Sequence, residues 1–429
     1  MIITIPALIK VLCVFGLILF LNRWRLGLSL SLFLGSLVLG FWMNLGPKAL
    51  VESMVQSLSQ IQTVSLFLIV GSILIISRLM KESGHLDRIV AGFSRLSGNE
   101  RTAGLVLPAL IGLLPMPGGA LFSAPMVETT FNRHSLSGEQ QTAVNYWFRH
   151  IWEYWWPLYP AVVLAVALLK VKTWQFIVFM APMTLIMVLA GMVFILKPIQ
   201  RQAIDEKKNF SAVELKAFIW EIMPILIVVM IIILLELMSS LLKIGGIQLN
   251  LPAAVSILPG LLVSIIWVML VNRISFKKLM SAVMDRGILS ILLLVAAIMI
   301  FQGMMKDSRA VGEIRSELMA YNIPILLVVV IMPFLSGLIT GIGIGFVGTS
   351  FPLIIPLFPT TSTFDFLSYA ALAYVLGFMG MMLSPVHLCF LVTKDYFKAS
   401  LLASYKYLAR PLAAVAFTAV LLFLITRLI

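Results

Sequence analysis

The sequence predicts an all-α polytopic membrane protein built from two inverted repeats, and three observations support this fold class. Of its 429 residues, 61% are hydrophobic and only 11% are charged, whereas soluble domains average about 25% charged residues. Apolar stretches of about 20 residues, the length that crosses a bilayer, recur along the whole chain. Two further apolar stretches are interrupted by glycine and proline at matching places in the two halves. We therefore expect five transmembrane helices, one re-entrant hairpin and one broken helix in each repeat.

The first repeat is predicted to occupy residues 1–196. Its hydrophobic pattern indicates transmembrane helices near 2–21, 26–45 and 61–79, an amphipathic interfacial helix within 81–101, a hairpin at 103–131, a broken helix at 142–169 and a last helix at 174–196.

The hairpin is the feature around which we interpret the chain. Helix-breaking residues lie in the middle of its apolar stretch, at Pro115, Pro117, Gly118 and Gly119. Each proline lacks an N–H donor and its ring crowds the preceding turn, so no continuous helix passes here. In lipid, broken backbone is tolerated only inside protein or beside a wet cavity. We therefore expect one helix to enter the membrane, a tip at these residues, and a second helix that leaves on the same side.

A polar linker at residues 197–216 separates the halves, and residues 217–429 repeat the plan. The second repeat is predicted to contain helices near 217–242, 250–271 and 287–305, an interfacial segment at 306–322, a hairpin at 323–358, a broken helix at 366–393 and a last helix at 411–428. Five crossings are an odd number, so the second half enters the membrane from the opposite side. This arrangement is an inverted-topology repeat.

Residue identities at a nearly constant offset indicate that the halves arose by duplication. Residues 333–339 match residues 108–114 at four of seven positions, 225 residues later in the chain. Ser350 follows Ser123 by 227 residues. Paired apolar segments interrupted by glycine and proline are the best sequence indication of a transporter binding site.

Basic loop residues predict the orientation of the chain in the membrane. A net charge of +13 would suggest a nucleic-acid partner for a soluble protein. In a membrane protein the positive-inside rule explains the same charge, so we expect contact with lipids and no nucleic acid. Most loop lysines and arginines fall on the face that holds the linker. That face is predicted to be cytoplasmic, which places both termini outside the cytoplasm.

The two hairpin tips supply the first group of candidate site residues. The candidates for substrate binding are Pro115, Pro117, Gly118, Gly119, Ser123, Thr340, Gly341, Gly343 and Gly345, and those for a coupling ion include Thr349 and Ser350. Glycine lets a ligand approach the main chain, and helix ends direct their dipoles at ions. The alternative is that these glycines only permit close helix packing.

Charged residues in the first broken helix form the second group. Asn145, Arg149 and Glu153 are spaced four residues apart and so share one helix face, with His150 and Trp156 nearby. A charge at the membrane centre costs about 2.5–3.5 kcal/mol. Two interpretations stay open. Either Arg149 and Glu153 only neutralise each other, or Arg149 binds a substrate carboxylate with its planar fork while Glu153 or His150 carries a coupling proton.

The second broken helix lacks these charges. Ser384 and His387 flank its break at Pro385, and Trp156-Pro157 marks the break in the first half. A single histidine in an apolar helix is more often a structural group than a ligand, but its position beside a break makes it a candidate. The chain has no glycine-rich phosphate loop, so ATP-driven pumping is not expected. No Cys/His spacing predicts a metal or another cofactor.

The Pro-x-Pro-Gly-Gly tip at 115–119 and the Ser-Pro-x-His-Leu-Cys break at 384–389, together with the two-half plan, resemble the ion transporter superfamily of secondary carriers. The similarity covers nearly the whole chain and favours a branch of archaeal and bacterial permeases related to dicarboxylate, gluconate and lactate permeases. It implies a homodimer in a prokaryotic inner membrane. It also implies a static scaffold from the first two helices of each half, and a mobile domain that carries substrate sites at the tips and breaks. The Ser-Asn-Thr tips of sodium-coupled dicarboxylate members are absent from both hairpins.

These features favour a secondary transporter that moves a small organic anion of the carboxylate class together with H⁺ or Na⁺. A passive channel or exporter on the same scaffold is an alternative. An intramembrane enzyme is less favoured, because few acids or bases are available within the apolar segments.

Overall fold

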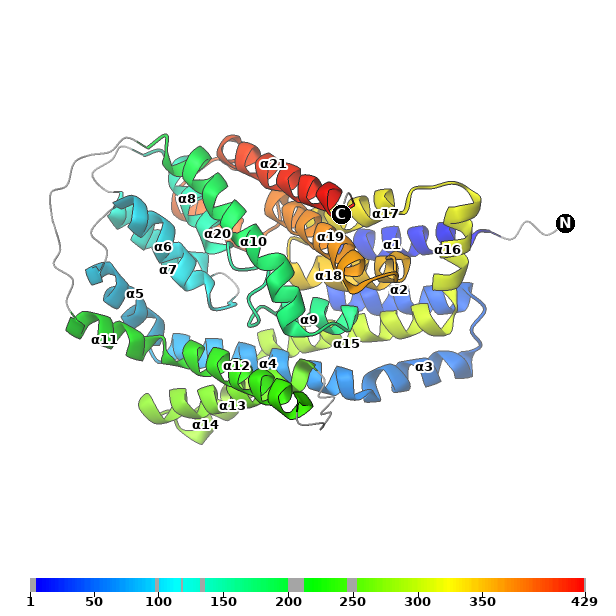
Figure 1. Cartoon of the computed structure of the whole chain (residues 1–429), viewed down its shortest axis with the longest axis horizontal. Helices are drawn as coiled ribbons and strands as arrows, with labels where there is room; N and C mark the ends of the chain where they lie inside the picture. Colours follow the sequence, from blue (N-terminus) through cyan, green and yellow to red (C-terminus); the bar gives the residue numbers. More distant parts are fainter. Residues whose placement is uncertain are drawn as a thin grey trace.

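The computed structural model describes residues 5–96, 100–116, 119–131, 136–199, 212–244 and 253–427. Within these ranges the chain is helical and contains no strand (Figure 1). The first half contains α1 (Ala7–Arg23), α2 (Leu28–Trp42), α3 (Pro47–Ser59), α4 (Ile61–Glu82), α5 (His85–Leu96), α6 (Glu100–Gly112), α7 (Ala120–Thr130), α8 (Gly138–Arg149), α9 (Pro160–Leu169), α10 (Thr173–Gly191) and a π-helical turn η1 (Met192–Leu196).

The second half contains a corresponding set of helices. These are α11 (Ala212–Glu221), α12 (Met223–Ile244), α13 (Ala253–Val271), α14 (Phe276–Val283), α15 (Arg286–Asp307), α16 (Ala310–Ala320), α17 (Ile325–Thr340), α18 (Gly343–Ile354), a 3₁₀ turn η2 (Ile355–Leu357), α19 (Thr363–Leu383), α20 (Leu388–Tyr396) and α21 (Leu401–Ile425).

Several described helices are long and apolar enough to cross a bilayer. Five segments meet this condition: α4, α10 with η1, α15, α19 with α20, and α21. A sixth is obtained if α11 and α12, which are bent by 69° at their junction, are counted as one span. The protein is therefore a multi-pass helical membrane protein, as its composition predicts.

Other apolar helices are shorter than expected from the prediction that each half crosses the membrane five times. α1 has 17 residues and α2 has 15. At a rise of about 1.5 Å per residue both are shorter than the hydrocarbon core of about 30 Å. Two short amphipathic helices, α3 and α14, were not predicted, because their polar faces hide them from a search for apolar runs.

Two helix boundaries differ from the prediction, one because of a proline and the other because of a serine cap. The expected helix at 217–242 is divided, since Pro224 cannot continue a hydrogen-bonded helix from α11 and instead occupies the first turn of α12. The last helix begins at Leu401 rather than 411. The Ser400 hydroxyl caps it by accepting from the amide of Ala403, and Pro411 lies inside the helix. The predicted linker lies largely outside the described residues, and its last part belongs to α11.

The helices of the second half begin at a nearly constant distance from those of the first. α2, α4, α5, α6 and α8 start 225 residues before α13, α15, α16, α17 and α19 respectively. The packing partners are exchanged between the halves. α2 packs on α15 and α13 on α4, while α9 packs on α18 and α20 on α7.

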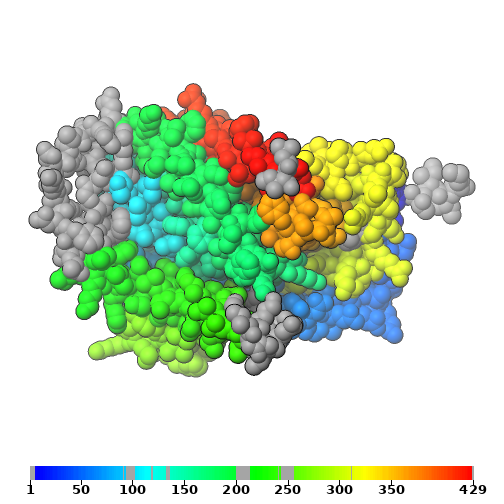
Figure 2. Space-filling view, viewed as in Figure 1, coloured from blue at the N-terminus to red at the C-terminus, as the bar shows by residue number. Residues whose placement is uncertain are grey.

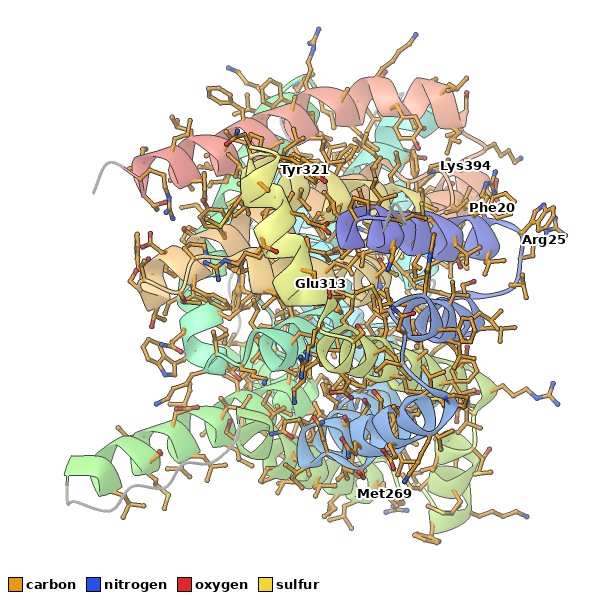
Figure 3. The ribbon with its side chains drawn as sticks, turned by 90° about the vertical axis from the view of Figure 1, so that its right-hand side faces the viewer. Phe20, Arg25, Met269, Glu313, Tyr321 and Lys394 are labelled. Atoms are coloured by element: carbon orange, nitrogen blue, oxygen red, sulfur yellow. The ribbon has the colours of Figure 1, made fainter. Side chains whose placement is uncertain are left out.

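A contact between the N-terminal helix α1 and α16 of the second half shows how tightly the halves are joined. The carboxylate of Glu317 on α16 accepts hydrogen bonds from the amides of Ala7 and Leu8, each at 2.7 Å. These amides belong to the first turn of α1, where no carbonyl of the same helix is available. Figure 3 shows α16, with Glu313 and Tyr321 labelled, beside α1.

Large apolar side chains cover much of the outer surface, as expected for contact with lipid. Figure 2 shows one such face, on which α10, α12 and α21 are visible. Exposed side chains on the first two of these helices include Trp174, Val178, Leu185, Met230, Ile233 and Leu237.

Candidate functional site

The end of α6, which leads into the first tip, is stabilised by side chains from the connector between α8 and α9. The last carbonyls of a helix have no partner within it, and in a membrane they must find one elsewhere. At the end of α6, Trp152 Nε1 donates to the carbonyl of Ala109 at 2.9 Å, and Trp156 Nε1 donates to the carbonyl of Leu113 at 3.0 Å. The Tyr159 hydroxyl donates to the carbonyl of Gly112. The end of α6 is thus held in place without continuing as a helix.

Arg149, the last residue of α8, reaches the first tip. Its side chain is buried, with 2% of its surface exposed. Its Nη2 donates to the carbonyl of Met116 at 3.1 Å, and its Nη1 lies 3.9 Å from Glu153 Oε1. A Cβ atom on Gly119 would lie 2.4 Å from Nη2. Glycine at this position therefore lets the guanidinium lie directly against the backbone of the tip.

The second tip lies between α17 and α18. Gly341 ends α17 with a φ of +64°, a conformation that side chains disfavour. A Cβ there would lie 2.9 Å from Ser384 Oγ, so the tip packs directly on the break between α19 and α20. In that break the Ser384 hydroxyl accepts from the amide of Val386 at 3.3 Å. Both interrupted segments therefore lie against the broken helix of their own half.

One cavity of about 200 Å³ brings both tips and both breaks together. Its lining includes, from the tips, Pro115, Met116, Gly341, Ile342, Gly343 and Ile344, and from the breaks, Arg149, His150, Glu153, Tyr159, His387 and Cys389. The opposite wall is apolar and comes from α4 and α15, through Leu74, Ile291 and Leu294. All titratable side chains of the lining thus come from the breaks.

Two histidines from different halves meet in this cavity. His150 Nε2 and His387 Nε2 lie 3.2 Å apart, and both rings are buried. His150 Nδ1 lies 2.5 Å from the carbonyl oxygen of Tyr146, which can only accept a hydrogen bond. Nδ1 therefore carries the proton, and Nε2 of the neutral ring presents a lone pair to the cavity. Glu153 Oε1 lies 3.8 Å from the same Nε2.

The other predicted site residues that the structure describes do not line this cavity. They are Gly119, Ser123, Asn145, Trp156, Pro157, Thr340, Gly345, Thr349, Ser350, Ser384 and Pro385. The hydroxyls of Thr349 and Ser350 donate within α18, to the carbonyls of Gly345 at 2.8 Å and Phe346 at 2.6 Å. Pro117 and Gly118 lie outside the described residues.

Asn145 connects the halves instead of facing the cavity. Its amide nitrogen donates to the carbonyl of Ala120 at 3.0 Å and to Thr393 Oγ1 at 3.2 Å. It therefore joins the start of α7 to α20.

Sequence reasoning missed two polar residues of the lining, Tyr159 and Cys389. The hydroxyl contact of Tyr159 with Gly112 of α6 depends on the tertiary fold, so no local pattern indicates it. Cys389 lies beside two histidines in space, and one of them, His150, is far away in the sequence, so no Cys/His spacing reveals the group.

These observations define a class: a multi-pass helical membrane protein with an internal cavity where interrupted helices from both halves converge. The family described as "Protein of unknown function (DUF401)" matches residues 5–429, and the chain belongs to this family. No curated protein matches the chain.

Proposed function

We propose that this protein is a secondary active transporter of a small organic anion, a carboxylate, coupled to H⁺ or Na⁺. The observation that carries the proposal is a buried arginine, paired with a carboxylate, in a cavity that both interrupted segments line. The guanidinium of Arg149 offers a planar fork that matches a carboxylate. Its partner Glu153 is 3.9 Å away, at the outer limit of an ion pair.

The same pair suggests how a proton and an anion bind together. Two unit charges about 4 Å apart attract by about 4 kcal/mol at an effective dielectric constant of 20. A proton on Glu153 removes this attraction, so Arg149 can then pair with the carboxylate of the substrate. Binding of the anion without the proton would leave two negative charges beside one positive charge. The cavity would therefore load both ligands or neither, which is the basis of symport.

The division of the cavity wall supports an elevator-type movement. The polar groups all come from the tips and breaks, whereas α4 and α15 contribute Leu74, Ile291 and Leu294. A smooth apolar wall makes few specific bonds that would resist sliding. We propose that the tips and breaks move together as one domain along this wall.

The pattern of the helices supports two inverted repeats. The constant 225-residue offset of helix starts and the exchanged packing partners are what a two-fold relation between the halves would produce. We propose that α6–α7 and α17–α18 are re-entrant hairpins that enter from opposite sides of the membrane. As the resemblance to secondary carriers implies, we further propose a homodimer in a prokaryotic inner membrane. The positive-inside rule supports placing both termini outside the cytoplasm.

Uptake into proteoliposomes tests the proposal. Purified protein is reconstituted and supplied with a panel of radiolabelled mono-, di- and tricarboxylates, with a proton gradient, a sodium gradient or neither. Saturable uptake of at least one carboxylate that requires a gradient is expected. Flux that does not saturate and ignores both gradients would indicate a passive channel. No uptake of any carboxylate under either gradient would refute the proposal.

Substitutions at the ion pair separate its two interpretations. If Arg149 binds substrate, Arg149→Ala abolishes uptake and Arg149→Ala/Glu153→Ala does not restore it. If Arg149 only neutralises Glu153, the double variant recovers transport. Arg410→Ala, at an exposed position on α21, is the control and should transport normally.

A further inference from the structure

We propose that His150, His387 and Cys389 form a binding site for a transition-metal cation of the Zn²⁺ type. The ligand atoms of these three residues all lie within 4.8 Å of one another, and each residue is buried. All three line the cavity, so a cation can reach them from the same space as a substrate. The site stands on this ligand geometry alone and does not require that the protein transports an anion.

The two imidazoles already have the spacing of metal ligands. Two nitrogens that bind Zn²⁺ at 2.0–2.1 Å in tetrahedral geometry lie about 3.3 Å apart. His150 Nε2 and His387 Nε2 are 3.2 Å apart. A thiolate sulfur in the same site would lie about 3.6 Å from each nitrogen. Cys389 Sγ is within 4.8 Å, so a movement of about 1 Å, within reach of a side-chain rotation, completes the set.

The surroundings of His150 and Cys389 favour their metal-binding forms. The carbonyl of Tyr146, 2.5 Å from His150 Nδ1, holds that ring in the tautomer whose Nε2 is free to coordinate. A hydrogen bond of this kind from the second nitrogen is the usual way in which proteins orient a histidine ligand. Cys389 is the second residue of α20, where the positive end of the helix dipole stabilises a thiolate. On binding, the thiol proton is released to solvent and the sulfur enters as the thiolate.

The donor set indicates which cation fits. Imidazole and thiolate together favour zinc or copper among common metals, while magnesium and calcium prefer oxygen ligands. Glu153 supplies a carboxylate oxygen 3.8 Å from His150 Nε2, close enough to become a fourth ligand. Zn²⁺ accepts nitrogen, sulfur and carboxylate oxygen in one tetrahedral site. Zn²⁺ is therefore the cation we assign.

Occupation of the site has a consequence for Arg149 that, unlike the site itself, rests on the proposed function. If Glu153 turns toward the metal, Arg149 Nη1 loses the carboxylate 3.9 Å away. The guanidinium then becomes available for an anionic ligand. Zn²⁺ should therefore increase the apparent affinity for any carboxylate that the uptake assay identifies as a substrate.

Metal binding to the purified protein tests the site without any transport assay. Protein stripped with a chelator is titrated with Zn²⁺ by calorimetry and with Co²⁺ by absorption spectroscopy. We expect one high-affinity ion per chain, intense visible Co²⁺ bands typical of tetrahedral geometry, and a thiolate-to-cobalt charge-transfer band. Binding without these bands would indicate an adventitious ion only, and no binding by the wild-type protein would also overturn the proposal.

The two cysteines of the chain provide a matched pair of variants. Cys389→Ser should remove the charge-transfer band and weaken Zn²⁺ binding by at least about tenfold. Cys13→Ser, on α1 at an exposed position, should change neither. His387→Ala should abolish the tetrahedral spectrum. If that variant fails to fold, the comparison of the two serine variants still decides the question, because equal Zn²⁺ affinities and spectra would refute the site.

Discussion

Replacement of Trp156 by phenylalanine tests how the end of α6, next to the first tip, is held in place. The substitution removes the indole N–H that donates to the carbonyl of Leu113 at 3.0 Å. Since α6 ends at Gly112, this carbonyl belongs to no helix, and no other described residue donates to it. Hydrogen bonds within membrane proteins contribute about 0.6 kcal/mol on average and about 1.7 at most. We expect the substitution to lower the local stability of this segment by about 1.5 kcal/mol. This value is near the upper end of the range because the carbonyl has no replacement donor.

Trp155→Phe is the matched control. Trp155 belongs to the same aromatic cluster, with its ring centroid 5.5 Å from that of Trp156. Its indole donates to the hydroxyl of Thr184 at 2.8 Å, so its loss leaves no backbone carbonyl without a partner. Both substitutions remove the same apolar surface, and the difference between them isolates the hydrogen bond to α6.

Hydrogen exchange of the Leu114 amide in nanodiscs provides the assay. This amide donates to the carbonyl of Ile111 at 3.3 Å, within the segment that Trp156 holds. A loss of 1.4 kcal/mol corresponds to about a tenfold change in an equilibrium. Exchange should therefore be about tenfold faster in Trp156→Phe than in Trp155→Phe. Equal exchange rates in the two variants would refute the argument that side chains from the α8–α9 connector stabilise the end of α6.

Three further predictions concern other parts of the fold. Gly341→Ala should lower the free energy of unfolding by about 1–2 kcal/mol and abolish uptake, because a side chain is disfavoured at φ +64° and its Cβ would lie 2.9 Å from Ser384 Oγ. Gly312→Ala is the control, since nothing lies within 4 Å of a Cβ there, and it should melt like the wild type. Glu317→Gln should lower stability by about 1 kcal/mol in chemical unfolding, because the carboxylate caps the first amides of α1. Burial lowers the pKa of His85, so the folded protein binds fewer protons there than the unfolded chain, and wild-type melting temperature should fall as pH drops below about 6.5. The His85→Gln variant should lack this part of the fall in melting temperature. Identical dependence of melting temperature on pH in both proteins would contradict the prediction.

The sequence predicted the interruptions of the helices more reliably than their exact ends. Pro115 and the glycines that follow it correctly indicated a gap between α6 and α7, because proline cannot donate within a helix wherever it lies. The predicted start of the last helix at 411 was wrong, since Ser400 caps this helix before Leu401 and Pro411 lies inside it. Local signals compete at helix ends, and tertiary packing decides which one prevails.

The candidate site was predicted as a set of segments, but its membership was decided by the fold. Among the candidate residues, Arg149, Glu153 and His387 line the cavity. Thr349 and Ser350 do not, because their hydroxyls are satisfied by carbonyls of their own helix. Whether a hydroxyl faces inward or bonds to its own helix depends on rotamer and neighbours, and a single sequence contains no direct record of either.

The amino-acid sequence by itself determined that this is a helical membrane protein with paired breaks, because hydropathy and the missing N–H of proline act locally. Only the tertiary structure placed His150 beside His387, which lies 237 residues away, and set Cys389 next to both. Contacts between distant residues arise from how the two halves pack into each other, as the exchanged partners of α2, α4, α13 and α15 show. That packing depends on the shapes of many side chains together, so no short motif encodes it.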